Sequence, residues 1–202
     1  MNQRGQTFSI VALVISLSTI LITLFVISLI PHGVIIQGVD ELLVRGQLYS
    51  LTVNALAHAS RGGDFRAFLN RELQHVSHNY IPLKEVYVKA VVVREGLSKC
   101  IVEYRTIYGY EKFEVYLELE LLRQYSYYDP SLSTYVVVLE VKVACDQYYP
   151  KRVDFYTREG YRTSHYREGG HYVITVYMNA LSHFKLYCED WRGIRTYLDI
   201  SP

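Results

Sequence analysis

The sequence predicts an α+β protein. A long N-terminal helix, first transmembrane and then amphipathic, is followed by a short helix and an antiparallel, β-sandwich-like domain. Two changes of pattern along the 202 residues predict this order. The chain has no charged residue at positions 7–30, and apolar residues then recur at helical spacing as far as Ser60. From Lys84 onward apolar and polar residues alternate, which is the period of a strand with one buried face.

The uncharged stretch at residues 8–30 is about as long as the roughly 20 apolar residues that a helix needs to cross a bilayer. Its only polar members are Ser and Thr, whose hydroxyls can bond to carbonyls of their own helix. Arg4 is the only charged side chain before the stretch, and the next Arg or Lys is Arg45. This bias predicts a cytoplasmic N-terminus and an extracytosolic remainder. The stretch is longer than the core of a secretory signal and no small-x-small site follows it, so we expect it to be retained.

Arg4, Gly5 and Gln6 stand where the short leader meets the apolar stretch. They resemble the processing site of archaeal type IV pilins, whose precursors carry a class III (prepilin-type) signal peptide. The resemblance implies that a membrane peptidase cuts between Gly5 and Gln6. It also implies that the apolar helix remains on the mature subunit and packs in the core of a filament.

The resemblance covers only residues 4–30, and the chain departs from the family pattern at two positions. Phe8 stands where a small residue is common, and Ile10 where an acidic residue is common. Two functions therefore stay open. The first is a structural subunit of a type IV pilus-like filament, minor rather than major, with related subunits, the membrane and the prepilin-type peptidase as partners. The second is a single-pass, signal-anchored β domain that binds a ligand or partner without polymerising.

After the apolar stretch, Pro31 and Gly33 are expected to kink or end the helix, because Pro removes a backbone donor and Gly adds freedom. The helical pattern then resumes as an apolar heptad seam over Ile35, Val39, Leu42, Gly46, Tyr49, Val53 and Leu56. Asp64 is placed to cap a second, short helix over about 65–79. The predicted regions are thus a leader at 1–5, a transmembrane or filament-core helix at 6–30, an amphipathic helical region at 31–82 and an extracytosolic β domain at 83–202.

The clearest predicted strands are 112–121 and 135–145, where every second residue is apolar. Further strands are expected at 85–94, 100–107, 152–157, 171–178, 183–189 and 194–200. The connections are too short for the helices that parallel strands need, so a purely parallel sheet is excluded. Three Arg-Glu-Gly triplets fall between strands and predict turns. Residues 156–171 are expected to form a solvated hairpin tip, although their Tyr, Arg and His content is also typical of a contact surface.

Strand alternation places Cys100, Cys145 and Cys188 on core-facing positions. Outside the cytoplasm a disulfide is plausible, and Cys145–Cys188 is favoured over Cys100–Cys145, with buried thiols as the alternative. Glu72, His75 and His78 share one face of the short helix, but no fourth ligand follows, so we expect a solvated face and no metal.

The sequence contains no signature of an enzyme or a cofactor site: no P-loop, dinucleotide fingerprint, HExxH or GxSxG. Lys and Arg number 21 against 20 Asp and Glu, and the basic residues are dispersed. This excludes a strongly basic nucleic-acid-binding surface. We therefore expect a non-enzymatic protein without cofactors.

Overall fold

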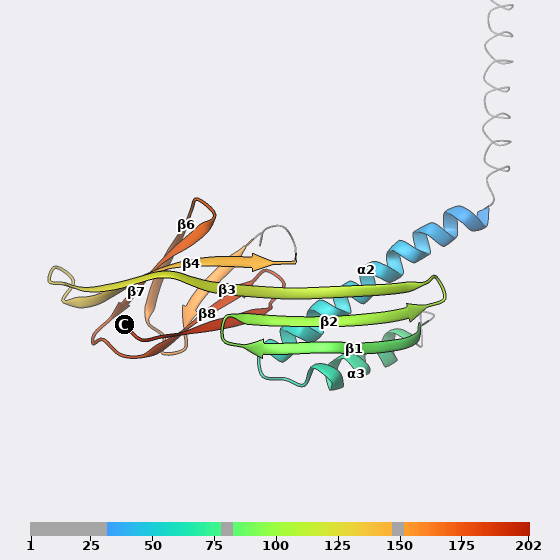
Figure 1. Cartoon of the computed structure of the whole chain (residues 1–202), viewed down its shortest axis with the longest axis horizontal. Helices are drawn as coiled ribbons and strands as arrows, with labels where there is room; N and C mark the ends of the chain where they lie inside the picture. Colours follow the sequence, from blue (N-terminus) through green and yellow to red (C-terminus); the bar gives the residue numbers. More distant parts are fainter. Residues whose placement is uncertain (1–31, 78–82, 147–151) are drawn as a thin grey trace, which may run out of the picture. The chain divides into compact units, whose positions relative to one another are not determined.

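The computed structural model describes residues 32–77, 83–146 and 152–202. In these ranges the chain forms two helices and then nine strands (Figure 1). The elements are α2 (His32–Ser60), α3 (Phe65–Ser77), β1 (Leu83–Arg94), β2 (Leu97–Thr106), β3 (Tyr110–Asp129), β4 (Thr134–Cys145), β5 (Val153–Thr157), β6 (Arg162–Glu168), β7 (His171–Met178), β8 (Phe184–Asp190) and β9 (Arg195–Ile200). All pairings between these strands are antiparallel, which confirms the α+β class and the antiparallel β domain.

The predicted membrane segment is not among these elements. Within the three described ranges, no helix is long and apolar enough to cross a bilayer. Residues 6–30 lie outside these ranges, as do the leader at 1–5 and Pro31. The β domain and the C-terminal half of α2 form one compact unit, Gly46–Pro202.

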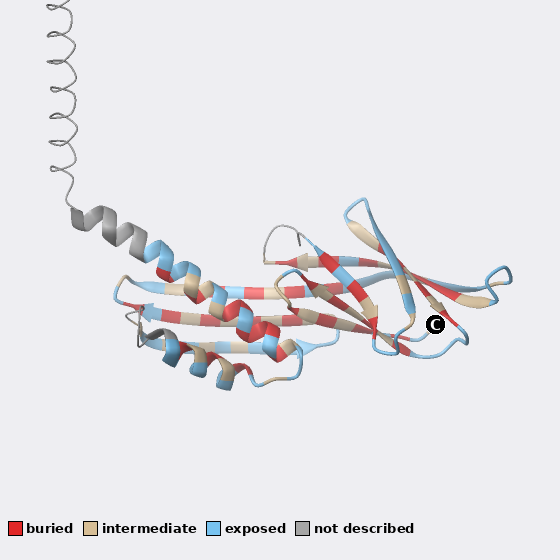
Figure 2. Cartoon of the chain, turned by 180° about the vertical axis from the view of Figure 1, so that it is seen from behind, coloured by how far each residue is buried: buried red, intermediate tan, exposed pale blue. Residues whose placement is uncertain are grey.

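The predicted heptad seam on α2 is buried only in part. Val53 and Leu56 are buried, but Leu42 is 70% exposed and Gly46 is also exposed. The fully buried positions of the helix in the compact unit include Leu48 and Thr52, which lie off the seam, and Figure 2 shows buried residues along this part of α2. A strict seven-residue repeat suits supercoiled helices, whereas a straight helix on a sheet keeps its 3.6-residue period and buries positions four apart.

The end of α2 and the start of α3 follow the sequence signals. Gly62 has a φ of 94° just beyond α2, a conformation that favours glycine. The Asp64 carboxylate accepts a hydrogen bond from the Ala67 backbone N–H at 3.0 Å, so the predicted N-cap is confirmed. Phe65 and Leu69 are buried on α3.

Six strands form a large sheet in the order β1-β2-β3-β4-β7-β6, and three form a small sheet in the order β5-β8-β9. We call the face of the large sheet that packs against α2 and the small sheet its inner face. Near β2 and β3 it meets α2, where the Thr52 and Tyr104 hydroxyls lie 2.8 Å apart. Near β6 and β7 it meets the small sheet, where the Phe155 ring lies 5.2 Å from the Tyr172 ring. The two-sheet part is consistent with the predicted sandwich.

Most predicted strands are confirmed to within a few residues, with two differences. β3 continues to Asp129, and β6 occupies part of the stretch that was expected to be a hairpin tip. No residue of β6 is buried, so it shows no apolar alternation. The predicted turns at the Arg-Glu-Gly triplets are confirmed, and their glycines have φ values of 73°, 75° and 56° at Gly96, Gly160 and Gly169.

Candidate functional site

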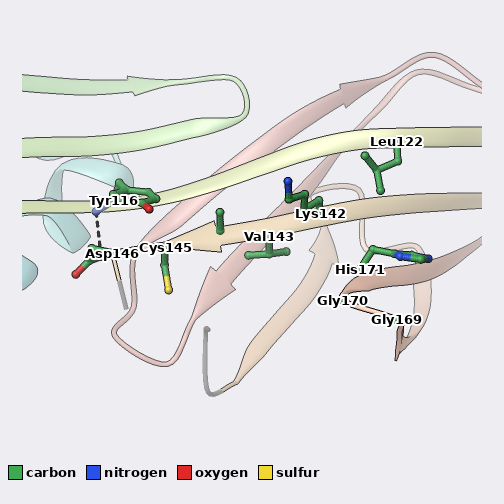
Figure 3. Close-up of a pocket in the computed structure, with 10 residues that line it drawn as sticks. Tyr116, Leu122, Lys142, Val143, Cys145, Asp146, Gly169, Gly170 and His171 are labelled. Atoms are coloured by element: carbon green, nitrogen blue, oxygen red, sulfur yellow. Dashed lines mark hydrogen bonds between the residues drawn. The ribbon is translucent and has the colours of Figure 1, made fainter. Parts of the chain in front are cut away.

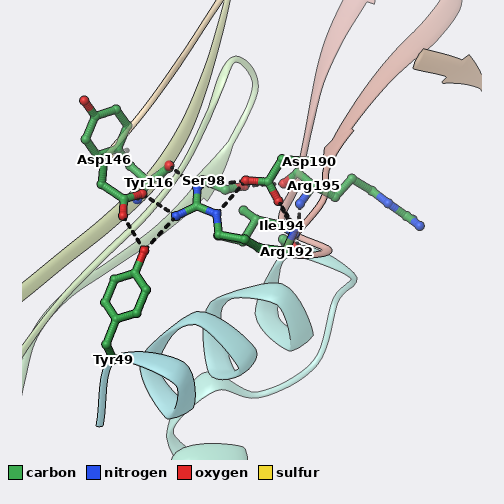
Figure 4. Close-up of polar contacts among 9 residues, drawn as sticks. Tyr49, Ser98, Tyr116, Asp146, Asp190, Arg192, Ile194 and Arg195 are labelled. Carbon is green, nitrogen blue, oxygen red and sulfur yellow. Dashed lines mark hydrogen bonds and ion pairs between the residues drawn. The ribbon is translucent and has the colours of Figure 1, made fainter. Parts of the chain in front are cut away.

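The most organised polar site is a junction of α2 with both sheets, formed by Arg192, Asp146, Asp190 and Tyr49 (Figure 4). The Arg192 side chain is 2% exposed and that of Asp190 is fully buried. Arg192 donates from Nε to Asp190 Oδ2 at 2.8 Å and from Nη1 to Asp146 Oδ1 at 2.6 Å. Its Nη2 donates to the Tyr116 carbonyl at 3.1 Å. One guanidinium therefore joins the end of β8, the end of β4 and the middle of β3.

The helix enters this junction through Tyr49. Its hydroxyl donates to Asp146 Oδ2 at 2.8 Å and accepts from Arg192 Nη1 at 3.3 Å. The Tyr49 ring also meets Phe113 edge-on, with centroids 5.9 Å apart. A ring on the helix thus packs on the sheet while its hydroxyl completes a buried ion-pair network.

Local sequence positions the arginine. Asp190 closes β8, and its Oδ1 accepts from the backbone N–H groups of Arg192 and Ile194 at 2.9 and 3.1 Å. Gly193 turns the chain with a φ of 78°. A short acidic side chain that bonds the backbone two residues on is a common turn device, and here it aims Arg192 inward.

The electrostatics of the junction favour permanent ionisation. Burial lowers the pKa of the Arg192 guanidinium, but the hydrogen bonds and charges of Asp146 and Asp190 outweigh it and raise the pKa above its usual range. A group that never releases its proton cannot act as an acid or base. The junction is therefore suited to fixing the helix on the β domain.

A second, more exposed cluster ties the end of α2 to the small sheet. Arg61 lies 2.7 Å from Glu189, and Arg195 lies 3.1 Å from the same carboxylate. The Arg195 backbone N–H also donates to the Ser60 hydroxyl at 3.0 Å. Burial raises the pKa of Glu189, but the hydrogen bonds from both arginines outweigh it, so the pKa is lowered.

The three cysteines lie where strand alternation predicted, all in the core. The structure draws no disulfide among them. Burial raises the pKa of Cys100 to about 12 and that of Cys188 well above its usual value. Burial also raises the pKa of Tyr172. The Cys145–Cys188 disulfide stays a prediction.

A cavity of about 610 Å³ lies where β4 runs beyond its pairing with β7 (Figure 3). The last rung of that pairing is Val141 with Tyr172. The cavity is lined by five ionisable side chains, those of Tyr116, Lys142, Cys145, Asp146 and His171. The Asp146 carboxylate is already bonded to Arg192 and Tyr49, so we assign no reaction to this cavity.

The predicted processing residues Arg4, Gly5 and Gln6 lie outside the described ranges, and so does Pro31 of the predicted kink. Gly33 lies in the first turn of α2. His78, one of three residues on the face considered for a metal, is likewise outside. Among the residues that the structure describes, no group of three or more His, Cys, Asp or Glu could hold a metal ion.

Sequence reasoning missed the junction. Asp190 and Gly193 give a local turn signal, but the partners of Arg192 lie 46 and 143 residues away in the chain, at Asp146 and Tyr49. No protein-family model, curated protein or solved structure matches this chain.

Proposed function

We propose that the protein is a minor structural subunit of a type IV pilus-like surface filament. The observation that carries this proposal is the Arg4-Gly5-Gln6 triplet directly before a stretch of residues, 7–30, without a single charge. In this proposal the apolar helix assembles with related subunits and the β domain faces outward for surface contact. The residue Ile10, where an acid is common, is the reason for proposing a minor rather than a major subunit.

The junction at Arg192 supports an architecture in which a helix carries a β domain. A subunit of a filament transmits load between its helix and its outer domain, so the two must be firmly joined. Arg192, Asp146 and Asp190 form a buried ion-pair network, and Tyr49 brings α2 into it. Such a network is costly to break from one side, because a lone buried charge remains.

The alternative is a single-pass anchored β domain that binds a partner without polymerising. The same uncharged stretch and the same junction suit this function, and the departures at Phe8 and Ile10 favour it. The two functions differ in processing and in assembly, so one pair of measurements separates them.

The test is the intact mass of the mature chain, produced in a host whose prepilin-type peptidase is shown to cut a known pilin. We expect a chain that begins at Gln6, and we expect Gly5→Val to block cleavage because a branched side chain replaces the residue at the cut. Gln3→Ala, outside the triplet, is the matched control and should be cleaved normally. The sheared surface fraction should then contain the cleaved chain.

A mature chain that keeps residues 1–5 would refute the filament proposal. If this chain also extracts from membranes only as a monomer, the anchored domain is supported instead. The same spectrum reports on Cys145 and Cys188, because a disulfide lowers the mass by two hydrogen atoms.

A further inference from the structure

β1 is an edge strand of the large sheet, and the described residues leave its outer edge open. It ends the strand order β1-β2-β3-β4-β7-β6, and Figure 1 shows it at the border of the sheet. No residue of β1 is buried, whereas every second residue of β2 is (Figure 2). Among the residues that the structure describes, no hydrogen bond joins the backbone of β1 to an element other than β2. Such an edge presents unpaired N–H and C=O groups to a strand that comes beside it.

The open edge is rich in valine. Val91 and Val93 pair with Cys100 and Ser98 of β2, which are fully buried on the inner face. Paired residues lie on one face of a sheet, so the two valines also belong to the inner face. They are nevertheless 36% and 42% exposed. The other edge strand of this sheet, β6, has no aliphatic residue. Of the two edges, β1 is therefore the one that leaves apolar side chains for a partner to cover.

A β-bulge determines how two copies of β1 can pair. The register against β2 shifts between Val88 and Ala90, so the inner-face residues are Val86 and Val88 before the bulge but Val91 and Val93 after it. Antiparallel strands pair residues that lie on the same face. A pairing that uses the whole strand therefore sets the segment before the bulge in one copy opposite the segment after the bulge in the other.

Charge selects one register of this pairing. The register that sets Glu85 opposite Arg94 of a second copy also sets Val86 opposite Val93, Tyr87 opposite Val92 and Val88 opposite Val91. It sets Lys84 opposite Glu95 as well. A shift by two residues in either direction leaves Glu85 opposite an uncharged residue. By symmetry each ion pair forms twice, once at each end of the paired strands, so the edge is complementary to itself.

The other charges beside this edge are already compensated within one chain. Lys89, at the bulge, lies 3.1 Å from Glu103 on β2. The two copies of Lys89 come near each other at the centre of the pairing, but each carries its own carboxylate. Glu85 lies 3.4 Å from Arg105, and the two side chains are 45% and 63% exposed. The exposed Glu85 carboxylate has room to accept a second guanidinium from the facing strand.

We propose that the open edge of β1 binds the same edge of a second copy of this chain, so that two large sheets join into one. The paired stretch 85–94 spans about 34 Å, at ~3.4 Å per residue. A single strand edge is a small interface, so we expect a reversible dimer. The proposal concerns the β domain alone. It does not depend on cleavage at Gly5 or on polymerisation, so its failure is distinct from a failure of the proposed function.

The pairing reverses the direction of the two chains. Thr52 of α2 meets Tyr104 of β2, and Ser60 meets Ser98 through Arg195. This part of α2 therefore runs against β2 and along β1. A two-fold axis that sets the β1 strands antiparallel also sets the two helices antiparallel. The helices thus enter the dimer from opposite ends, as chains on two facing surfaces do.

The experiment cross-links the full chain in detergent micelles through cysteines at one rung of the pairing. Tyr87→Cys/Val92→Cys sets two thiols opposite each other at both symmetric positions. Paired strands hold Cα atoms about 4.5–5.5 Å apart, which a disulfide can span. Under a mild oxidant we expect a dimer and no larger species, because both thiols of each chain are used. Tyr87→Cys and Val92→Cys alone are the matched controls and should give little dimer, since no new thiol lies opposite theirs.

Charge reversal in the double-cysteine background tests the register. Arg94→Glu sets two carboxylates opposite each other at both ends and should lower the yield of dimer by about fivefold or more. Glu85→Arg/Arg94→Glu restores opposite charges and should restore the yield. Arg123→Glu reverses a charge on β3 that is 78% exposed and away from β1, so it should leave the yield unchanged. Circular dichroism should show that every variant folds.

Equal cross-linking of the double and single cysteine variants would overturn the proposal. Trimers and larger species would also overturn it, because they indicate open pairing and not a closed two-fold dimer. A yield that Arg94→Glu leaves unchanged, or that the double reversal does not restore, would overturn the register. Phosphatidylcholine vesicles that carry the unmodified chain should cluster, and Arg94→Glu should reduce the clustering. Vesicles that stay apart although the dimer forms in detergent would overturn the arrangement on facing surfaces.

Discussion

Replacing Arg192 by Met should destabilise the β domain more than any exposed substitution. The variant keeps most of the side-chain volume but removes four donated hydrogen bonds, to Asp190, Asp146, Tyr49 and the Tyr116 carbonyl. The Asp190 side chain is fully buried, so its negative charge is left without its partner cation. Removing one side of a buried ion pair costs about 3–5 kcal/mol. This is a large part of the ~5–15 kcal/mol that stabilises a typical domain.

The assay is urea unfolding of the full chain in detergent, followed by far-ultraviolet circular dichroism. Arg105→Met is the matched control, because Arg105 pairs with Glu85 at 3.4 Å and the two side chains are 63% and 45% exposed. An exposed pair of this kind contributes about 0–1 kcal/mol. If Arg192→Met costs no more than Arg105→Met, the junction does not hold the domain together and the reasoning is refuted.

Two further predictions concern single side chains. Thr52→Val leaves the buried Tyr104 hydroxyl without the oxygen that lies 2.8 Å from it, so the free energy of unfolding should fall by about 1–3 kcal/mol, and an unchanged urea midpoint would contradict this. Glu189 has a lowered pKa because the hydrogen bonds of its two arginine partners outweigh burial. Its ionised carboxylate therefore stabilises the fold at a pH above its pKa in the unfolded chain, and this stabilisation is lost as the pH falls through its pKa in the folded chain. Glu189→Gln should therefore lower stability at pH 7, and the difference should shrink as the pH falls below the usual pKa of a glutamate; a difference that stays constant as the pH falls would show that the charge is not the cause.

The strands of the β domain were largely predictable because strand alternation is a local property. Val115, Leu117 and Leu119 each face the core, and their spacing alone reveals this. β6 was not predictable, because its sequence has no buried residue and its pairing with β7 depends on the partner strand. The turns were predictable where a glycine such as Gly96 adopts a positive φ.

The Arg192 junction could not be predicted, for a physical reason. The charge on Arg192 is compensated by Asp146, and the two residues are brought together only when both sheets and the helix have packed. Nothing near Arg192 in the sequence indicates that its side chain is buried. A sequence pattern indicates which residues of one strand or helix are buried. A buried ion pair depends instead on how distant elements pack together.

One irregularity in β3 decides which of its side chains face away from the core. The register shifts between Leu121, which pairs with Val141, and Arg123, which pairs with Glu140. Without this bulge, Tyr125 would share the face of Leu121 and point toward the core, because alternate residues of a strand lie on one face. The bulge moves the odd-numbered residues of the second half of β3 outward and leaves Gln124 inward, where it bonds the Ser201 carbonyl at 2.7 Å. One extra residue in β3 therefore places Tyr125 and Tyr127, which are 54% and 49% exposed, on the face of the large sheet away from the core.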